Sequence, residues 1–270
     1  MRYGGNTTCV EIQTAQNTRI ILDAGSGLRA LGNSFVDKEN VLSELSPIHL
    51  FLTHRHIDHV IGLPYFQPFR NPEQLVIVRC GNATVAEVHQ LAATMAGPPL
   101  FVPVPTIDEV MRIEPCDTGV CVQVDAKTSV TKFEARHNGG AAVFRIDGAS
   151  GSAIAFAPDN ELSYASNDAS VTEWRNNLAQ ALRDVPILIH DATYSDAELD
   201  RFVGWGHSSA EEATRFAMEC GAKQLILFHH HPDRSDDHVD KMVTACRTIA
   251  LRETNALEII AAYEGMSLAL

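Results

Sequence analysis

The sequence reads Phe51-Leu52-Thr53-His54-Arg55-His56-Ile57-Asp58-His59 at the end of an apolar run that begins at Ile48. Such a run predicts a buried strand, so the polar cluster lies on the loop that follows it. Because alternate residues of an extended segment point the same way, His54 and His56 can converge on one ion. Asp58 and His59 follow where the chain turns, and they can bind a second ion. Imidazole with carboxylate suits Zn²⁺, and Mn²⁺ or Fe are alternatives.

A polar loop with merely solvated histidines is the alternative interpretation, and residues further along the chain argue against it. His137 lies just past another predicted strand. Alone it is typical of a surface turn, but beside His54 and His56 it is the natural third imidazole for the first ion. Asp159 also follows an apolar strand. Its two carboxylate oxygens can each bind one metal, so we expect it to bridge the two ions.

The second ion needs another histidine beside Asp58 and His59. The run His229-His230-His231 supplies candidates, again at the end of a predicted strand. These residues alone do not decide which of the three binds. Several strands would thus deliver ligands to one edge of the sheets.

Asp23 ends a further predicted strand, directly before a glycine-rich turn. One interpretation is an ordinary cap or turn residue. The other, which we favour because His54 has the same place at a strand end, is a carboxylate that orients the metal-binding loop.

Two later motifs suggest proton transfer. Asp191 follows the strand predicted over residues 185–189, and His207 stands between Gly206 and the helix predicted over residues 208–220. An N-capped helix explains Ser208 as the cap, but it does not explain the histidine before it. His207 is therefore a candidate proton donor to a leaving group, and Asp191 is the acid that would orient or charge it.

The remaining hydrophobic patterns predict strands that alternate with helices along the whole chain. The segment through Pro103 and Pro105 is irregular and is a candidate for one rim of the active site, and residues 108–113 fit either a short helix or a strand. We expect strands over residues 8–12, 19–22, 48–52, 75–78, 120–124, 130–135, 141–146, 153–157, 185–189, 223–228 and 257–262, and helices over 84–95, 172–182, 208–220 and 235–252.

The spacing H-x-H-x-D-H after a hydrophobic strand resembles the signature of the metallo-β-lactamase superfamily. The order of motifs is similar to its phosphodiesterase branch, and above all to tRNase Z and the phosphoribosyl cyclic phosphodiesterases. tRNase Z has H-E-A-T and G-H-S-T where this chain has His190-Asp191-Ala192-Thr193 and Gly206-His207-Ser208-Ser209. The resemblance covers nearly the whole chain.

This resemblance implies an α/β fold, a four-layer αββα sandwich in a single domain over residues 1–270 that lacks a first N-terminal strand of its relatives. It also implies two divalent metal ions, with His229 rather than His230 as the last ligand. The implied metal ligands are His54, His56 and His137 for one ion, Asp58, His59 and His229 for the other, and Asp159 for both; the implied catalytic residues are Asp58, Asp191 and His207.

The chain also departs from both comparison families. tRNase Z carries a long arm that clamps tRNA, commonly between the third histidine motif and the bridging aspartate, but here a predicted hairpin fills the segment from His137 to Asp159. The phosphoribosyl enzymes add a cysteine-rich structural zinc site that Cys9 alone cannot supply. Asp191 replaces a glutamate and is one methylene shorter, which shortens its reach to His207.

Composition narrows the partners and the compartment. A net charge of −13, spread along the chain, repels polyanions and argues against a broad nucleic-acid interface. Six scattered cysteines without a CxxC pair indicate reduced thiols and a cytoplasmic protein. We see neither a leader sequence nor an apolar run long enough to span a membrane.

We therefore expect a dinuclear metal-dependent hydrolase, most simply a phosphodiesterase that attacks a small or cyclic phosphodiester with a metal-bound hydroxide. The same metals could serve a lactone or thioester hydrolase, which is the enzymatic alternative. A metal-bound sensory or interaction domain with little turnover is the alternative from another class, and a nuclease for short single-stranded RNA stays open. A homodimer is expected only by analogy with relatives.

Overall fold

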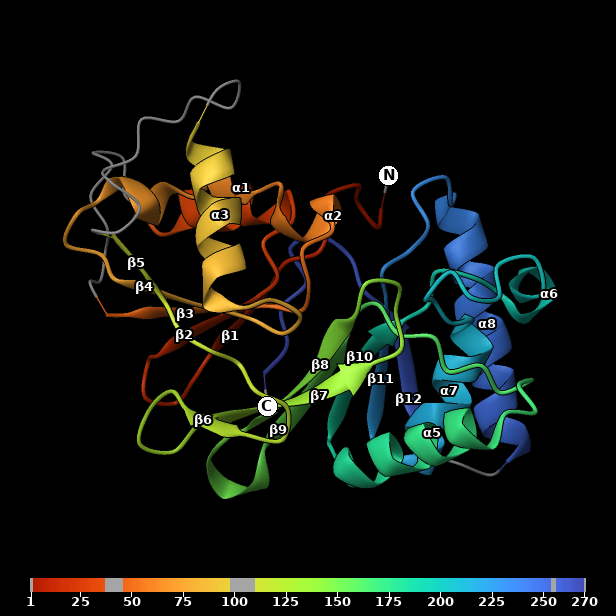
Figure 1. Cartoon of the computed structure of the whole chain (residues 1–270). Helices are drawn as coiled ribbons and strands as arrows, with labels where there is room; N and C mark the ends of the chain where they lie inside the picture. The colour runs from red at the N-terminus through yellow and green to blue at the C-terminus, as the bar shows by residue number, and fades with distance from the viewer. Residues whose placement is uncertain (1, 37–45, 98–109, 254–255, 270) are drawn as a thin grey trace. The chain divides into compact units, whose positions relative to one another are not determined.

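The structure is a computed structural model that describes residues 2–36, 46–97, 110–253 and 256–269 (Figure 1). The chain forms two compact units: an N-terminal unit, Asn6–Lys132, and a C-terminal unit, Phe133–Leu270 with Met1–Gly5. The irregular segment through Pro103 and Pro105 lies outside the described residues. The expectation of a single domain over residues 1–270 stays a prediction.

The N-terminal unit is built on a sheet whose strands follow the order of the chain. The first two strands are antiparallel, and the others are parallel to their neighbours. Because Leu22 pairs with Phe51, the residues after both strands emerge at the same edge of the sheet. The strands are β1 Val10–Gln13, β2 Arg19–Leu22, β3 Ile48–Leu52, β4 Val76–Cys80 and β5 Met111–Ile113.

Helices cover one face of this sheet. Leu50 and Val78 face Leu28, Phe66 and Val88 in one buried cluster. β3 is buried along its whole length, His49 included, which explains why its other four residues are apolar. A capping box between Thr84 and Glu87 starts α3, which is the longest helix in the described part of this unit. The helices are α1 Gly27–Ser34, α2 Ile57–Val60, η1 Leu63–Tyr65, η2 Gln67–Arg70 and α3 Val85–Ala96.

The second sheet runs in the order β12-β11-β10-β9-β8-β7-β6. Strands β9 to β12 are parallel, β8 is antiparallel to β9, and β6 pairs with the first part of β7, which belongs to the N-terminal unit. The strands are β6 Cys121–Gln123, β7 Ser129–Ala135, β8 Ala141–Asp147, β9 Ala153–Ala157, β10 Ile187–Asp191, β11 Gln224–Phe228 and β12 Glu258–Ala261.

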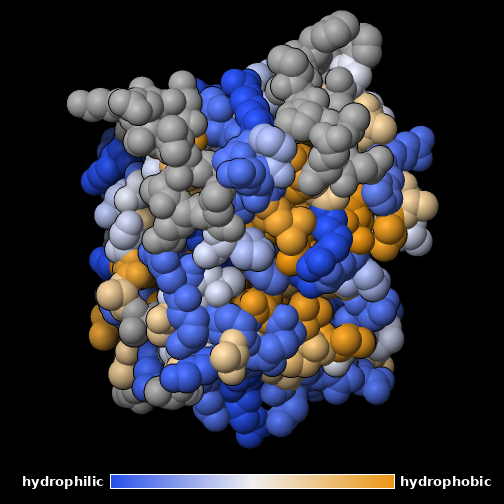
Figure 2. Space-filling model, turned by 90° about the vertical axis from the view of Figure 1, so that its left-hand side faces the viewer, coloured by the Kyte–Doolittle hydropathy of each residue, from blue (hydrophilic) through white to orange (hydrophobic). Residues whose placement is uncertain are grey.

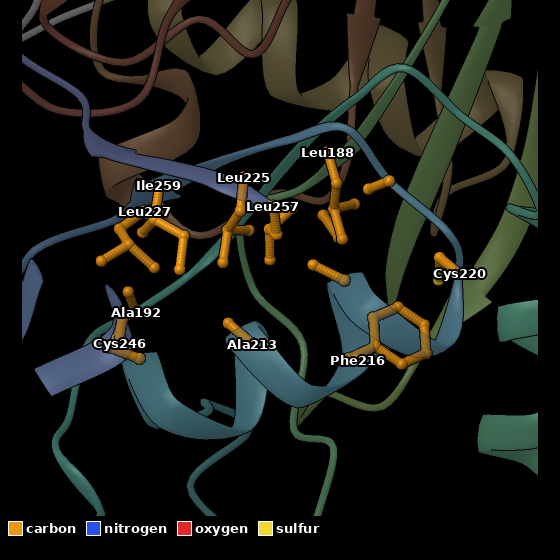
Figure 3. Packing of buried hydrophobic residues seen from close by; sticks show 14 of the residues in the cluster. Leu188, Ala192, Ala213, Phe216, Cys220, Leu225, Leu227, Cys246, Leu257 and Ile259 are labelled. Carbon is orange, nitrogen blue, oxygen red and sulfur yellow. The ribbon is translucent and has the colours of Figure 1, made fainter. Parts of the chain in front are cut away.

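The core of the C-terminal unit lies between its sheet and its helices. Figure 3 shows Ala213 and Phe216 pointing toward Leu188 and Leu225, and all four side chains are inaccessible to solvent. Burying a leucine or phenylalanine side chain stabilises the fold by about 1.5–3 kcal/mol. The helices are η3 Ala149–Gly151, α5 Ala169–Ala181, α6 Asp196–Leu199, α7 Ala210–Glu219 and α8 Asp236–Arg252.

Most predicted elements are confirmed within a few residues, and the prediction is wrong at one helix cap and at several element ends. The cap of α7 is Ser209, whose hydroxyl accepts a hydrogen bond from the Glu212 N–H. Ser208, the predicted cap, instead donates to the Asn160 carbonyl oxygen at 2.5 Å. Strand β10 extends to Asp191, two residues beyond its predicted end, and α5 begins at Ala169 rather than residue 172.

On the face drawn in Figure 2, hydrophilic residues cover much of the surface, and hydrophobic residues gather at its centre and to the right of it. All six cysteines are free thiols, as expected. Within the described ranges, every helix is too short or too polar to cross a membrane.

Candidate active site

The histidine loop of the N-terminal unit gathers four candidate ligands after β3. His54 Nε2 lies 2.9 Å from His56 Nδ1, and the rings of His54 and His59 are 4.2 Å apart. The turn of α2 brings Asp58 Oδ2 to 3.3 Å from His59 Nε2. His54 and His59 are inaccessible to solvent, whereas the side chain of Asp58 is 36% exposed. All four donors thus converge on one short loop.

Asp23 orients this loop through hydrogen bonds to His59 and Thr53. Its Oδ2 accepts a hydrogen bond from His59 Nδ1 at 2.8 Å, and its Oδ1 accepts one from the Thr53 N–H at 2.6 Å. The proton of His59 is therefore on Nδ1, and Nε2 is the nitrogen that can bind a metal. Complete burial raises the pKa of Asp23, and hydrogen bonds from His59 and Thr53 oppose this effect only in part.

Thr53 extends the influence of Asp23 to a second histidine. Its hydroxyl donates to the Asp23 carboxylate at 2.9 Å and lies 3.0 Å from His54 Nδ1. Because that hydroxyl proton is used on Asp23, His54 Nδ1 must donate to Thr53 Oγ1. His54, like His59, then presents Nε2 to an ion.

In the C-terminal unit, Asp159 lies between two histidines at the ends of separate strands. Its Oδ2 is 3.5 Å from His137 Nε2, and its Oδ1 is 3.3 Å from His229 Nε2. Only 2% of the Asp159 surface is exposed. One oxygen directed at each histidine is the arrangement that a bridging carboxylate requires. Ligand atoms of Asp159, His207 and His229 all lie within 4.8 Å of one another.

Backbone and hydroxyl partners orient these histidines as well. His137 Nδ1 donates to the Gly206 carbonyl oxygen at 2.8 Å. Gly206 has φ +86°, and a Cβ there would lie 2.3 Å from His137 Nδ1, so only glycine fits. His229 Nδ1 lies 3.1 Å from Thr193 Oγ1, whose hydroxyl donates to the His229 carbonyl oxygen at 2.9 Å. Both histidines therefore direct Nε2 toward Asp159.

His230, the alternative ligand, is directed elsewhere. Its Nε2 donates to the Ala262 carbonyl oxygen at 3.3 Å. Burial lowers the pKa of His230 to about 4, so the ring is neutral at pH 7. Of the two histidines, it is His229 whose Nε2 is directed toward Asp159.

Asp191 reaches His207 although it is shorter than glutamate. Its Oδ2 accepts a hydrogen bond from His207 Nδ1 at 2.7 Å, while its Oδ1 accepts one from the Thr193 N–H at 2.9 Å. Asp191 is fully buried, and the His207 side chain is 15% exposed. Burial lowers the pKa of His207, but the charge and hydrogen bond of Asp191 outweigh it and leave that pKa raised. Asp191 thus favours the protonated form of His207, whose side chain remains partly accessible to solvent.

Three partner residues were not predicted from the sequence. Thr53 and Thr193 lie within the quoted motifs, and that position was the available signal. Glu161 had no such signal: its two oxygens accept hydrogen bonds from the Gly204 and Gly206 N–H groups at 3.0 and 2.7 Å. Glu161 thereby fixes the turn that precedes His207.

His190, which belongs to one of the quoted motifs, makes a hydrogen bond that connects two segments of the fold. It is fully buried, and its Nε2 accepts a hydrogen bond from Asn160 Nδ2 at 3.1 Å. That bond tethers β10 to the segment after β9, which carries Asp159.

The donor set fits a divalent metal ion. Imidazole nitrogens and carboxylate oxygens are the ligands of zinc and related metals, and each oriented histidine has a hydrogen-bond partner on its other nitrogen. The predicted site residues fall into two groups, one in each unit: His54, His56, Asp58 and His59 in the N-terminal unit, and His137, Asp159, Asp191, His207 and His229 in the C-terminal unit.

Comparisons with known proteins agree with the fold. A family model described as a β-lactamase superfamily domain matches residues 18–230. Ribonuclease Z of Myxococcus xanthus is 41% identical over 70 residues, which are 26% of this chain and 22% of that protein. The chain thus spans about a fifth to a quarter of the length of the curated relatives it matches first.

Solved structures match over almost the whole chain. The metallo-β-lactamase fold protein YhfI from Bacillus subtilis has a TM-score of 0.69 at 18% identity, covering 98% of this chain and 94% of its own. Unliganded yeast PDE1 has a TM-score of 0.70 at 15% identity, with the same coverage of 98% and 94%. The predicted fold class, α/β with two sheets and flanking helices, is confirmed.

Proposed function

Because the chain belongs to the metallo-β-lactamase superfamily, we propose that it is a dinuclear metal-dependent phosphodiesterase for a small or cyclic phosphodiester. The observation that carries this proposal is the hydrogen-bonded pair of His207 and Asp191, which lies beside Asp159 and His229. Metal ligands next to a poised acid are what a phosphodiester with a poor leaving group requires.

Seven residues are the metal ligands in this proposal. A catalytic zinc takes about three protein ligands and keeps one position open. The proposed ligands are His54, His56 and His137 for one ion, Asp58, His59 and His229 for the other, and Asp159 for both. Zn²⁺ suits this imidazole-rich set best, with Mn²⁺ or Fe as alternatives. Bound ions would supply activated water near neutral pH and charge to offset the phosphoryl oxygens.

The protein's own contribution to bond cleavage is a proton. Asp191 holds His207 through Nδ1 and stabilises its protonated form, so the proton on Nε2 can pass to the departing oxygen. After the transfer, neutral His207 keeps its Nδ1 proton, which stays hydrogen-bonded to the Asp191 carboxylate. Because the His207 side chain is accessible, its Nε2 can then take up a new proton from solvent, while buried Asp191 holds the ring in place.

A small substrate is favoured over tRNA. The segment between His137 and Asp159 is the antiparallel pair of β8 and β9, not an extended arm. The net charge of −13 opposes a broad polyanion interface. The free cysteines support a reducing compartment, for which we propose the cytoplasm.

Hydrolysis of bis(p-nitrophenyl) phosphate tests the proposal, with metal content measured on the same protein. We expect turnover of this activated substrate by the wild type. For a phosphodiester with an alkoxide leaving group, such as a ribose cyclic phosphate, we expect a loss of about 10²–10⁴-fold in His207→Ala, because a positioned acid contributes about that much. Metal content should not change. His89→Ala, which removes an exposed histidine of α3, is the matched control and should retain activity.

Two results would contradict this account. Loss of metal together with activity in His207→Ala would make His207 a ligand rather than a proton donor. No turnover at full metal loading would transfer the proposal to a lactone or thioester hydrolase, and, if those substrates also fail, to a metal-bound domain without turnover.

A further inference from the structure

The C-terminal unit contains a pocket of about 240 Å³ that the proposed chemistry does not use. Tyr194, Phe202 and His231 form part of its lining. Tyr194 directly follows Thr193, which contacts His229, and its ring centroid lies 6.2 Å from that of His207. The pocket therefore begins one side chain away from the proposed proton donor.

Aromatic rings make up one wall of this pocket. The rings of Tyr194 and Phe202 are stacked, with centroids 4.3 Å apart and planes at 3°. Trp205 meets the edge of Phe202 at 5.5 Å and is 59% exposed. His231 lies 6.3 Å from Tyr194. Tyr194 is buried, so the flat lining side chains that remain partly accessible are Phe202 and His231, which are suited to stacking against another flat ring.

The charges in the pocket argue against a second phosphate group. Arg234, a lining residue, donates to both carboxylate oxygens of Glu198 at 2.8 and 2.7 Å and to the Thr193 carbonyl oxygen at 2.9 Å. The hydrogen bond from Arg234 lowers the pKa of Glu198 to about 2, so this pair is fully ionised and neutralised at pH 7. Asp233 adds an exposed carboxylate. A neutral ligand suits these charges better than an anion.

The polar groups of the pocket can form hydrogen bonds with the edge of a heteroaromatic ring. The Asp233 N–H donates to His231 Nδ1 at 3.3 Å, which leaves the imidazole proton on Nε2 as a hydrogen-bond donor. The Asp233 carboxylate is an acceptor. A donor beside an acceptor matches the ring nitrogens and amino groups at the edge of a nucleobase.

We propose that this pocket binds the nucleobase of the substrate. This inference rests on the proposed function, and it specifies the substrate class as a nucleoside phosphodiester, such as a nucleoside cyclic phosphate. The base stacks against the aromatic wall while the phosphodiester lies at the His207 side. A base-free sugar phosphate leaves the pocket empty and binds less tightly.

Binding of adenosine, compared with ribose, tests the pocket independently of catalysis. By isothermal titration calorimetry of the metal-loaded protein, we expect adenosine to bind and ribose to bind far more weakly. Phe202→Leu keeps an apolar side chain but removes the stacking ring, and it should weaken adenosine binding about tenfold, since one stacked base contributes about 1–3 kcal/mol. Phe133→Leu on β7, outside the pocket lining, is the matched control.

Hydrolysis separates the two proposals. For 2′,3′-cyclic AMP, Phe202→Leu should raise KM about tenfold, and for the base-free methyl riboside 2′,3′-cyclic phosphate it should leave KM unchanged. Adenosine binding that depends on Phe202, without hydrolysis of either compound, would support the pocket and overturn the proposed phosphodiesterase. Hydrolysis without discrimination between the two substrates, or adenosine binding indifferent to Phe202→Leu, would overturn the pocket and retain the enzyme.

Discussion

Asp23 carries no atom that we assign to a metal, yet its carboxylate sets the orientation of two histidines. It accepts hydrogen bonds from His59 directly, and it controls His54 through the Thr53 hydroxyl. Its own backbone has φ +60°, a conformation that costs a non-glycine residue about 1–3 kcal/mol. The surrounding hydrogen bonds offset this cost and hold the conformation, which is typical of residues that orient a functional site.

Asp23→Asn should weaken metal binding. The amide keeps the size of the side chain, but its NH₂ group cannot accept the hydrogen bonds that both carboxylate oxygens accept now. Changes to such hydrogen-bonding partners of ligands cost about 10–100-fold in metal affinity, which competition with a chromophoric chelator would measure. Asp125→Asn, which alters a carboxylate bonded to Thr14 in the same unit, is the control. Equal affinity in wild type and Asp23→Asn would refute this role.

At the scale of elements, one ion pair ties α6 to the start of α8. Glu198 completes the capping box of α6 with Ser195 and pairs with Arg234, which lies directly before the α8 cap. Arg234 also donates to the Thr193 carbonyl oxygen, between Asp191 and the rest of the pocket wall. The segment that carries the proposed acid is therefore fastened to two helices.

This pair makes stability depend on pH. The folded-state pKa of Glu198 is lowered to about 2 from 4.5, so its contribution is complete above pH 4.5 and is lost as the pH falls toward 2. Because the side chain is 33% exposed, we expect Glu198→Gln to cost only about 1 kcal/mol at pH 7. Urea unfolding at pH 7 and at pH 3.5 should show the difference from wild type shrinking at the lower pH. Glu173→Gln on α5 should show no such change; a pH-independent difference for Glu198→Gln would contradict the assignment.

At the scale of the whole molecule, sequence patterns predicted most strands and helices, because a buried strand leaves a readable apolar run before its polar loop. The same patterns led us to expect metal ligands at the strand ends. They failed where a distant partner decides the outcome. Ser208 and Ser209 are equivalent locally, and Ser208 loses the cap only because its hydroxyl bonds to the backbone of Asn160 and Leu162. Glu161 likewise acts on glycines more than 40 residues away. Such contacts have no period or spacing that a sequence alone displays.

In the proposed function, each chain holds two metal ions. The most direct test is the number of metal ions per chain, measured by elemental analysis after dialysis, in wild type, His56→Ala and His229→Ala, with exposed His89→Ala as control. We predict two ions per chain in the wild type and the control, and fewer than two in both His56→Ala and His229→Ala. One ion or none in the wild type, or two in both ligand variants, would contradict the dinuclear site.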